Sequence, residues 1–193
     1  NLSKFALKNG IEGFEYFSGI PGSVGGAVKM NAGCYGSETK EILNSIEFYN
    51  KNFQKKNKNK ENLNLSYRSS NIKDNEIISK VTFNLKYGDS NIIQQKMIDI
   101  KEKRLLTQPI NNKTSGSTFK NPKNLFAAKL IEEAGCKGMK YGNAVVSNQH
   151  ANFLINKGRA TATDIENLGK QVVEKVYKKF NIILDWEIKI IGD

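Results

Sequence analysis

The chain has 193 residues, 38% of them hydrophobic, and a formal net charge of +11. That length is enough for one large or two small domains with a buried core. The composition excludes a disordered chain, and no apolar run reaches transmembrane length. Lysine supplies most of the charge, since arginine occurs only at Arg68, Arg104 and Arg159. Surfaces that bind nucleic acid favour arginine. We therefore expect no nucleic-acid and no membrane partner, and an anionic substrate would also suit the positive field.

Two cysteines and one histidine limit the chemistry that the chain could carry. Cys34 and Cys136 are about a hundred positions apart and have no nearby Cys or His, which excludes a zinc knuckle or a C-x-x-C redox pair. This usage is typical of a reducing compartment, and we expect a cytoplasmic protein. A lone imidazole, that of His150, argues against a metal cage or a histidine relay, so no metal site is predicted.

The first half of the chain combines helical and extended patterns. Residues 1–10 have the pattern of an amphipathic helix that stops at Gly10, and without an initiator Met we interpret the chain as a fragment that lacks an N-terminal part. Residues 45–49 and residues 77–87 alternate apolar and polar side chains, which predicts two strands. The polar run at 50–64 predicts a loop or a hairpin extension.

The lysine-rich run at 55–60 has no interleaved aromatic residues and is typical of a solvated loop. After the second strand, Asp89 or Ser90 could cap a helix that runs to about Leu106. The apolar stripe of that helix would consist of Ile92, Ile93, Met97 and Ile100.

A break in the pattern at 109–113 predicts a domain boundary, which divides the chain into residues 1–106 and residues 107–193. A short helix is predicted at 126–134 and would end at Gly135. The other predicted elements are strands at 145–146 and 151–155, a helix that opens at Thr163 with Ile165, Leu168, Val172, Val176 and Phe180 on its apolar face, and a final strand at 183–191. The predicted fold class is α+β, in two parts.

A glycine-rich segment early in the chain is the most informative feature of the sequence. The four glycines Gly19, Gly22, Gly25 and Gly26 lie within eight positions, together with a proline. Glycine allows close approach to the backbone, and such a turn can present several N–H groups to a phosphate or a flavin carbonyl. The spacing matches neither of the common phosphate-binding loops. A tight connection packed under a sheet is the alternative interpretation.

Three polar positions are candidates for chemistry. Arg68, a rare arginine, lies in the segment 67–70, where a surface ion pair would be the ordinary explanation. Ser117 lies between glycine and threonine before a Lys-Asn-Pro turn, and ordinary turn chemistry explains that composition equally well. Glu187 lies on the predicted last strand, and periodicity alone does not separate it from Asp185 as a solvated carboxylate.

Together these segments resemble the UDP-N-acetylenolpyruvoylglucosamine reductase family over essentially the whole chain. Five motifs occur in the family's order, which makes coincidence an inadequate explanation. The motifs are Gly19-Ile20-Pro21-Gly22-Ser23-Val24-Gly25-Gly26, Tyr67-Arg68-Ser69-Ser70, Gly116-Ser117-Thr118-Phe119-Lys120-Asn121-Pro122, Ala128-Lys129-Leu130-Ile131-Glu132-Glu133-Ala134-Gly135 and Trp186-Glu187-Ile188.

The resemblance implies the second half of a vanillyl-alcohol-oxidase-like FAD-binding domain, followed by the family's C-terminal substrate-binding domain. It also implies an NADPH-dependent flavoenzyme of peptidoglycan synthesis that reduces the enolpyruvyl group of UDP-N-acetylenolpyruvoylglucosamine to give UDP-N-acetylmuramate. The implied cofactor is FAD, NADPH is the hydride donor, and no obligate protein partner is expected.

The resemblance also assigns roles to individual residues. Ser117 would donate a proton, and Arg68 and Glu187 would complete the catalytic set. The nucleotide of the substrate would contact Asn121 and, on a looser match, His150. The implied FAD contacts are Gly19, Ile20, Pro21, Gly22, Ser23, Gly25, Gly26 and Asn31. The family has a second glycine-rich loop in an N-terminal region that this sequence does not contain, so we expect only part of the FAD site in these residues.

Three alternatives remain at the level of sequence. The chain could belong to another FAD-dependent oxidoreductase of the same fold, or be an inactive fragment of the reductase. It could also be a noncatalytic, lysine-rich nucleic-acid binder, which predicts binding that weakens steeply with salt. The serine motif around Ser117 and the segment around Glu187 favour the reductase.

Overall fold

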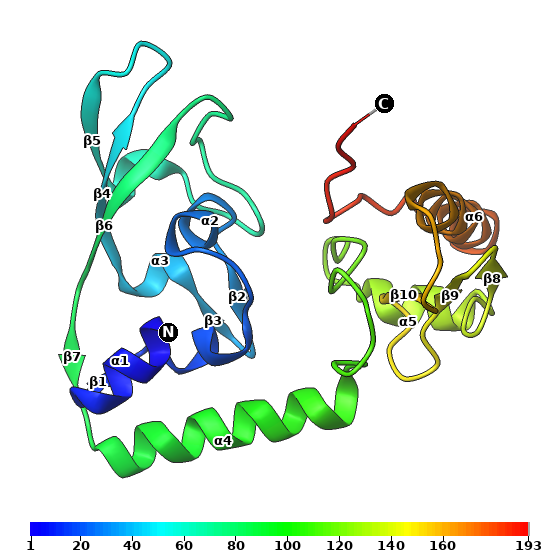
Figure 1. The fold of residues 1–193 in the computed structure, drawn as a ribbon, viewed down its shortest axis with the longest axis horizontal. Coiled ribbons are helices and arrows are strands. Elements are labelled where there is room, and N and C mark those ends of the chain that lie inside the picture. Colours follow the sequence, from blue (N-terminus) through cyan, green and yellow to red (C-terminus); the bar gives the residue numbers. More distant parts are fainter. Residues whose placement is uncertain (193) are drawn as a thin grey trace. The chain divides into compact units, whose positions relative to one another are not determined.

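The computed structural model describes residues 1–192, and these belong to two compact units that divide after Lys103. Both units combine helices with antiparallel strands, so the predicted α+β class is confirmed (Figure 1). Each unit has a hydrophobic core of its own.

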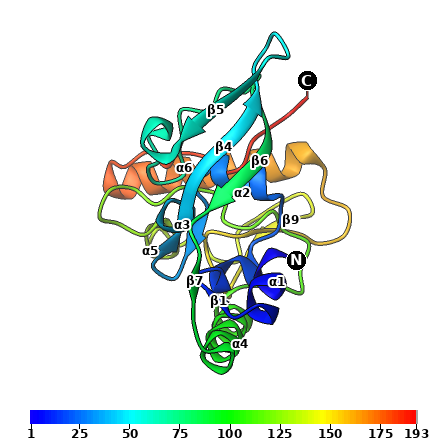
Figure 2. The same ribbon diagram turned by 90° about the vertical axis from the view of Figure 1, so that its left-hand side faces the viewer.

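The first unit is built on a three-stranded antiparallel sheet in the order β5-β4-β6 (Figure 2). Its strands are β4 (Leu43–Tyr49), β5 (Lys55–Asn59) and β6 (Ile77–Phe83). Apolar and polar residues alternate along β4, so one face of the sheet is buried. The short helix α2 (Val24–Lys29) contributes Val28 to the core on that face. That core contains Val28, Leu43, Ile46, Phe48, Leu63 and Ile72.

The prediction of a solvated loop at 55–60 is wrong for most of that segment. Lys55–Asn59 forms the edge strand β5, and η2 (Lys60–Leu63) follows it. Glu47 on the central strand forms ion pairs with Lys55 on one neighbouring strand and Lys80 on the other. A lysine-rich edge strand discourages further strand pairing, so the composition reflects an exposed edge rather than a loop.

Smaller elements complete the first unit. Helix α1 (Leu2–Lys8) is confirmed and packs with Ile11 and Phe14 into a small second core. The predicted strand at 77–87 is interrupted, because after β6 the chain continues as β7 (Lys86–Tyr87), which pairs with β1 (Ile11–Glu12). The remaining elements are η1 (Glu15–Gly19), the hairpin of β2 (Gly33–Cys34) and β3 (Ser37–Glu38), and α3 (Thr39–Ile42).

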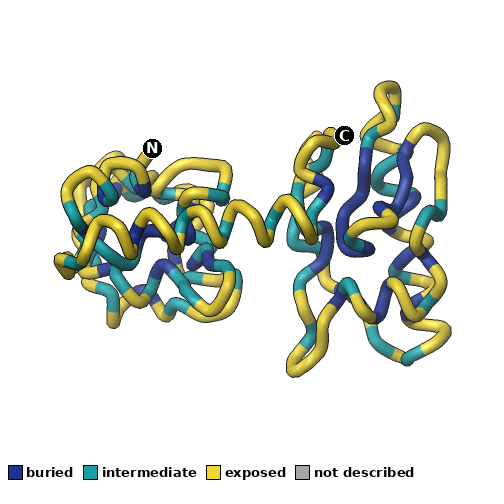
Figure 3. Tube along the Cα trace, turned by 90° about the horizontal axis from the view of Figure 1, so that it is seen from below, coloured by how far each residue is buried: buried dark blue, intermediate teal, exposed yellow. Residues whose placement is uncertain are grey.

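Helix α4 (Ser90–Thr107) confirms the predicted helix and is exposed over much of its length (Figure 3). Ile93 is buried, and Met97 and Ile100 are partly buried at the following helical spacings. The placement of Ile92 on that stripe is wrong, since its side chain is 56% exposed. The buried surface of this helix is therefore a narrow apolar stripe formed by Ile93, Met97 and Ile100.

The second unit has an antiparallel sheet in the order β10-β9-β8. Its strands are β8 (Lys140–Tyr141), β9 (Ala144–Val146) and β10 (Leu154–Asn156), and its helices are α5 (Ala127–Glu133) and α6 (Ala162–Phe180). The predicted stripe of α6 is confirmed where Leu168, Val172 and Val176 are fully buried. The predicted end of α5 is confirmed at Gly135, which adopts a φ of 72°.

Three predictions for the second unit are wrong in whole or in part. The predicted strand at 151–155 is shifted, because residues 151–152 form a turn and β10 begins only at Leu154. Helix α6 opens at Thr161 rather than Thr163: the Thr161 hydroxyl accepts from the Asp164 backbone N–H, and the Asp164 carboxylate accepts from the Thr161 backbone. Residues 183–191 form no continuous strand, because only Trp186 makes a ladder pair, with Phe119. Apolar alternation produces a strand only where a partner backbone is available.

Within residues 1–192, no helix combines the length and apolarity that crossing a bilayer requires. The same residues contain no group of three or more His, Cys, Asp and Glu side chains suited to a metal ion. Neither Cys34 nor Cys136 forms a disulfide within residues 1–192.

Candidate active site

The glycine-rich segment forms an exposed turn between η1 and α2. Ser23 is the N-cap of α2, and its Oγ accepts a hydrogen bond from the Gly26 N–H at 3.0 Å. Gly22 has a φ of 127°, and a Cβ built there would meet no atom within 4 Å. The backbone of this turn is therefore open to close approach by another group, and Gly22 supplies a conformation that few other residues tolerate.

Arg68 lies at a turn between Ser66 and Ser69 that is closed by reciprocal backbone hydrogen bonds. Arg68 itself has a φ of 52°. Its Nη2 donates to the Gly33 carbonyl at 3.0 Å, and its guanidinium lies 4.9 Å from the Tyr67 ring centroid. The side chain is thus oriented by specific contacts, which goes beyond the single surface ion pair expected of an ordinary arginine.

Asn31 is fully buried and uses its carboxamide inside the protein. Its Nδ2 donates to Glu38 Oε2 and to the Ser66 carbonyl, both at 3.1 Å, and its Oδ1 accepts from the Lys40 N–H at 2.9 Å. Both donors of the amide are engaged, so the side chain braces the Arg68 turn against the β2–β3 hairpin. A flavin contact at Asn31 stays a prediction and would have to use the backbone or the remaining capacity of Oδ1.

The carboxylate of Glu38 connects these contacts electrostatically. A hydrogen bond from Lys40 is the main cause that lowers its pKa, and Asn31 and the charge of Arg68 act in the same direction. Glu38 is therefore ionised at neutral pH and partly balances the positive charge near Arg68.

In the second unit, Ser117 and Glu187 lie on adjacent extended segments. The Glu187 N–H donates to the Thr118 carbonyl at 2.8 Å, and Phe119 pairs with Trp186 one step further along. On its other edge the serine segment pairs with Phe153 through Ser117 itself. The structure therefore brings two of the three predicted catalytic residues onto neighbouring backbone segments, while Arg68 belongs to the other unit.

Asn121 and His150 have local roles in the same unit. Asn121 Oδ1 accepts from the Ala127 N–H at 2.9 Å and so caps the start of α5. His150 Nδ1 accepts from the Asn152 N–H at 3.3 Å, and the ring makes an edge contact with Phe153. Burial lowers the pKa of His150, so the imidazole is neutral at neutral pH. Contacts of either residue with a nucleotide stay predictions.

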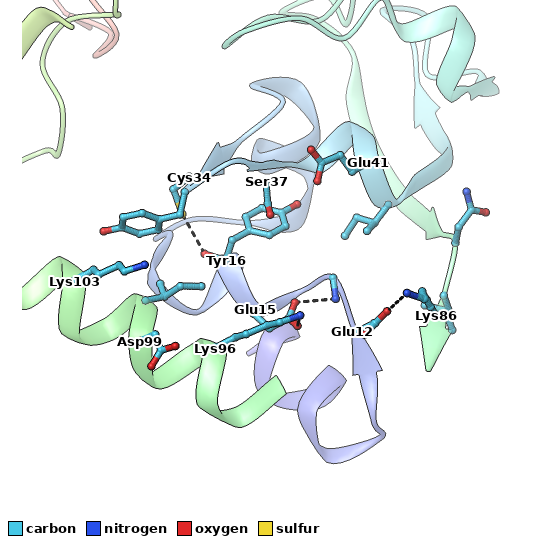
Figure 4. A pocket seen from close by; sticks show the side chains of 16 residues that line it. Glu12, Glu15, Tyr16, Cys34, Ser37, Glu41, Lys86, Lys96, Asp99 and Lys103 are labelled. Carbon is cyan, nitrogen blue, oxygen red and sulfur yellow. Dashed lines mark hydrogen bonds and ion pairs between the residues drawn. The ribbon is translucent and has the colours of Figure 1, made fainter. Parts of the chain in front are cut away.

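A cavity of about 550 Å³ lies elsewhere in the first unit, between η1, the β2–β3 hairpin and α4 (Figure 4). Acidic and lysine side chains line it, including the buried Glu15, whose Oε1 lies 3.6 Å from Lys96 Nζ. Tyr16 also lines it, and burial raises the pKa of its phenol. None of the predicted site residues lines this cavity, so it gives no geometric support to those assignments.

One residue beside the serine segment, Asn152, is not among the residues that the motifs indicate. Asn152 is 4% exposed and lies between the buried apolar residues Ala151 and Phe153. A polar residue within an apolar run is a recognisable signal, because a buried carboxamide needs hydrogen-bond partners. The sequence does not reveal which partners those are.

Comparisons with known proteins agree with this arrangement. Residues 108–191 match the family model described as UDP-N-acetylenolpyruvoylglucosamine reductase, C-terminal domain. The UDP-N-acetylenolpyruvoylglucosamine reductase of Rickettsia rickettsii (strain Sheila Smith) is 46% identical over 192 residues, and that of Clostridium tetani is 44% identical over 193 residues. These alignments cover 100% of the chain but 65% and 63% of the two relatives. The chain thus spans less than two thirds of the length of these two relatives.

A solved structure matches both units in one alignment. The UDP-N-acetylenolpyruvylglucosamine reductase (MurB) of Thermus caldophilus superposes with a TM-score of 0.87 and 34% identity, over 97% of this chain and 67% of that protein. The fold is therefore that of an α+β protein with a reductase-type C-terminal domain. The chain belongs to the UDP-N-acetylenolpyruvoylglucosamine reductase family.

Proposed function

We propose that the chain forms the greater part of an NADPH-dependent flavoenzyme that reduces the enolpyruvyl group of UDP-N-acetylenolpyruvoylglucosamine to give UDP-N-acetylmuramate for peptidoglycan. The observation that carries the proposal is the 46% identity to the Rickettsia rickettsii reductase along the whole chain. The neighbouring positions of Ser117 and Glu187 are in keeping with it. A cytoplasmic location is in keeping with two cysteines that form no disulfide within residues 1–192.

The residues around the glycine-rich turn fit part of an FAD site. The open backbone at Gly22 leaves room for a flat ligand, and the capped start of α2 holds the turn in shape. The proposed contacts are Gly19, Ile20, Pro21, Gly22, Ser23, Gly25, Gly26 and Asn31. When bound, FAD supplies the hydride that it receives from NADPH.

Ser117 is the proposed proton donor. Hydride addition to the terminal alkene carbon of the substrate leaves negative charge on the carbon beside the carboxylate, and that carbon must then be protonated. A serine hydroxyl is a weak acid, but it can protonate so strong a base when it is held in line with it. Backbone pairing with Phe153 fixes the position of the Ser117 main chain for this role.

Arg68 is proposed to stabilise the same developing charge, and Glu187 is the third proposed catalytic residue. The guanidinium of Arg68 cannot lose its proton and offers several donors to an enolate-like oxygen. Its hydrogen bond to the Gly33 carbonyl uses one of those donors and restricts the rotation of the side chain. Glu187 would orient the substrate or the proton donor, and Asn121 and His150 would contact the nucleotide.

The decisive experiment uses the full-length protein and measures the two half-reactions separately by stopped flow. We predict that Ser117→Ala spares reduction of the flavin by NADPH, since that step needs no proton from the serine. Oxidation of the reduced flavin by the enolpyruvyl substrate should slow by ~10²–10⁴-fold, the range expected of a positioned general acid. The matched control is Ser115→Ala, because Ser115 is exposed and two residues away.

Each outcome of that experiment has a distinct meaning. An unslowed second step in Ser117→Ala would remove Ser117 as the acid, and equal slowing of both steps would indicate a folding or flavin-binding defect. If the unsubstituted protein oxidises NADPH but leaves the enolpyruvyl substrate unchanged, another flavin-dependent oxidoreductase activity must be sought. A protein without bound FAD would contradict the proposed function as a whole.

A further inference from the structure

The buried side chain of Asn152 holds the backbone segment that carries Ser117. Asn152 Nδ2 donates to the Phe119 carbonyl at 2.8 Å, and the Phe119 N–H donates to Asn152 Oδ1 at 2.9 Å. The backbone carbonyl of Asn152 also accepts from the Thr118 N–H at 2.8 Å. Three hydrogen bonds from one residue therefore fix the two positions that follow Ser117.

The chemistry of the carboxamide explains why asparagine suits this position. A primary amide carries one acceptor and donors side by side, as a peptide group does, so its side chain can complete a ladder where no backbone is available. Phe119 is 1% exposed, and its N–H and C=O would both be buried without partners if the amide were removed. Aspartate would lack the donor, and an apolar residue would lack both groups.

The other edge of the same segment leads to the second predicted catalytic residue. Thr118 donates its N–H to Asn152 and accepts at its carbonyl from the Glu187 N–H. The Lys120 N–H donates to the Asp185 carbonyl at 2.8 Å. The serine segment is thus the middle of three, with Asn152 on one edge and Glu187 on the other, so a shift at Asn152 would displace both.

The turn that carries Asn152 is itself firmly held. Ser147 is buried, and its Oγ accepts from the N–H groups of Gln149 and His150 at 3.1 and 3.2 Å. The Ser147 N–H donates to the Phe153 carbonyl at 2.9 Å, while His150 Nδ1 accepts from the Asn152 N–H. These bonds connect the end of β9 to Asn152 with little freedom between them.

We propose that Asn152 is a positioning residue of the active site, which acts through the backbone of residues 118–119 to hold the Ser117 hydroxyl in line for proton transfer. The catalytic part of this inference rests on the proposed function. The geometric part rests only on the hydrogen bonds of Asn152 to Thr118 and Phe119.

The kinetic test compares two asparagines of the same region in the full-length protein. Asn156 also uses both its amide nitrogen and its amide oxygen in hydrogen bonds, but its side-chain partners are Gly158 and Ala160 in the following turn. We expect Asn152→Ala to slow oxidation of the reduced flavin by the substrate by ~10–100-fold, since a displacement of about 1 Å can cost 10²-fold. Flavin reduction by NADPH should stay unchanged, and Asn156→Ala should leave both steps unchanged even if it lowers the Tm as much.

A double-mutant cycle separates positioning from general loosening. If Asn152 acts through Ser117, then Asn152→Ala added to Ser117→Ala should slow the second step by less than about 2-fold further. A full additional 10–100-fold loss would overturn the inference. Equal slowing of the second step by Asn156→Ala would overturn it as well.

Hydrogen exchange tests the geometric part without any turnover. Asn152→Ala should accelerate exchange of the Phe119 amide, and Asn156→Ala should not. If the unsubstituted protein shows no reductase activity, the proposed function fails, but this measurement still tests whether Asn152 fixes the backbone of the serine segment. Unchanged protection of the Phe119 amide in Asn152→Ala would show that it does not.

Discussion

Arg68 and Ser117 are held by different kinds of contact. Arg68 has left-handed backbone geometry at a short turn, and its guanidinium is tethered to the Gly33 carbonyl of a neighbouring hairpin. Ser117 lies on an extended segment whose backbone pairs on both edges, next to the fully buried Phe119. The position of a group that is held through side chains depends on how closely the neighbouring elements approach. The position of a group on a paired backbone depends on the backbone hydrogen bonds and on the hydrophobic core behind them.

The first prediction breaks the hairpin that anchors Arg68. A Cβ at Gly33 would lie 2.1 Å from the Ser37 carbonyl oxygen and 2.9 Å from the Glu38 Cα, both of them backbone atoms. Because backbone cannot rotate away, Gly33→Ala should lower the free energy of unfolding by about 3 kcal/mol, at the upper end of overpacking costs. Urea unfolding of the full-length protein measures this.

Gly36→Ala is the control for the hairpin. Gly36 has a φ of 86° but open space around its Cβ position, so only backbone strain of about 1–2 kcal/mol is expected there. A smaller cost at Gly33 than at Gly36 would show that the hairpin can rearrange.

The second prediction concerns the matching close contact in the second unit. A Cβ at Gly169 would lie 2.1 Å from the Trp186 ring, which is a side chain and can tilt. Alanine also favours the helix by about 0.5–1 kcal/mol. We therefore expect a smaller net loss for Gly169→Ala than for Gly33→Ala, about 1–2 kcal/mol.

Trp186 is the one tryptophan of these 193 residues, so the difference in emission between a variant and the unsubstituted protein reports on the tilt of its ring. Lys170→Ala changes an exposed residue of the same helix and is the control. A shift of the emission in Gly169→Ala but not in Lys170→Ala is expected. An unchanged spectrum with a large loss of stability would mean that the helix moves instead of the ring.

The third prediction compares two fully buried threonines. Thr39 donates its hydroxyl to the Ala32 carbonyl at 2.8 Å, whereas Thr118 Oγ1 has no hydrogen-bond partner among residues 1–192. Thr39→Val should lower the free energy of unfolding by about 0.5–1.5 kcal/mol, since it removes the hydroxyl hydrogen bond while the Ala32 carbonyl keeps the bond from the Thr39 N–H. Thr118→Val removes an unpaired buried hydroxyl and should be neutral or stabilising by up to about 1 kcal/mol.

Chemical denaturation of both variants under one condition checks this difference. Equal losses at the two positions would mean that Thr118 has a partner that stabilises the fold. In that case the side chain of Thr118, and not only the backbone hydrogen bonds, would help to hold the serine segment in place.

The smallest predicted effect is a pH dependence. Burial lowers the pKa of His150 below its ordinary value of 6.5. The unfolded state therefore binds the proton more readily, so the stabilising contribution is present above pH 6.5 and is lost as the pH falls through the folded pKa. His150→Gln should reduce the decline in unfolding free energy between about pH 7.5 and 5.5 relative to the unsubstituted protein.

The comparison uses the difference between the two proteins, which cancels carboxylates common to both. Parallel pH profiles would contradict the neutral, buried state of His150. They would also weaken the view that its Nδ1 accepts from Asn152.

Local patterns in the sequence were sufficient for much of the fold. The extents of α4 and α5, the buried stripe of α6 and the exposed glycine turn all follow from periodicity, caps and backbone preferences within a few residues. The sequence-based predictions are wrong where the formation of a strand depends on a partner strand. The lysines of β5 have a polar pattern but find a partner in β4, while residues 183–191 alternate correctly and find a partner only at Trp186.

For the candidate site, the sequence by itself determined which side chains are available. The motifs around Arg68, Ser117 and Glu187 occur in the family's order and can be recognised in the sequence, so they identify the family. Only the tertiary structure decided how those groups are held. The bonds between Asn152 and Phe119 join residues 33 positions apart, and no local preference encodes a partner at that distance. An asparagine within an apolar run predicts that its side chain needs buried hydrogen-bond partners, but only the folded backbone determines which groups those partners are.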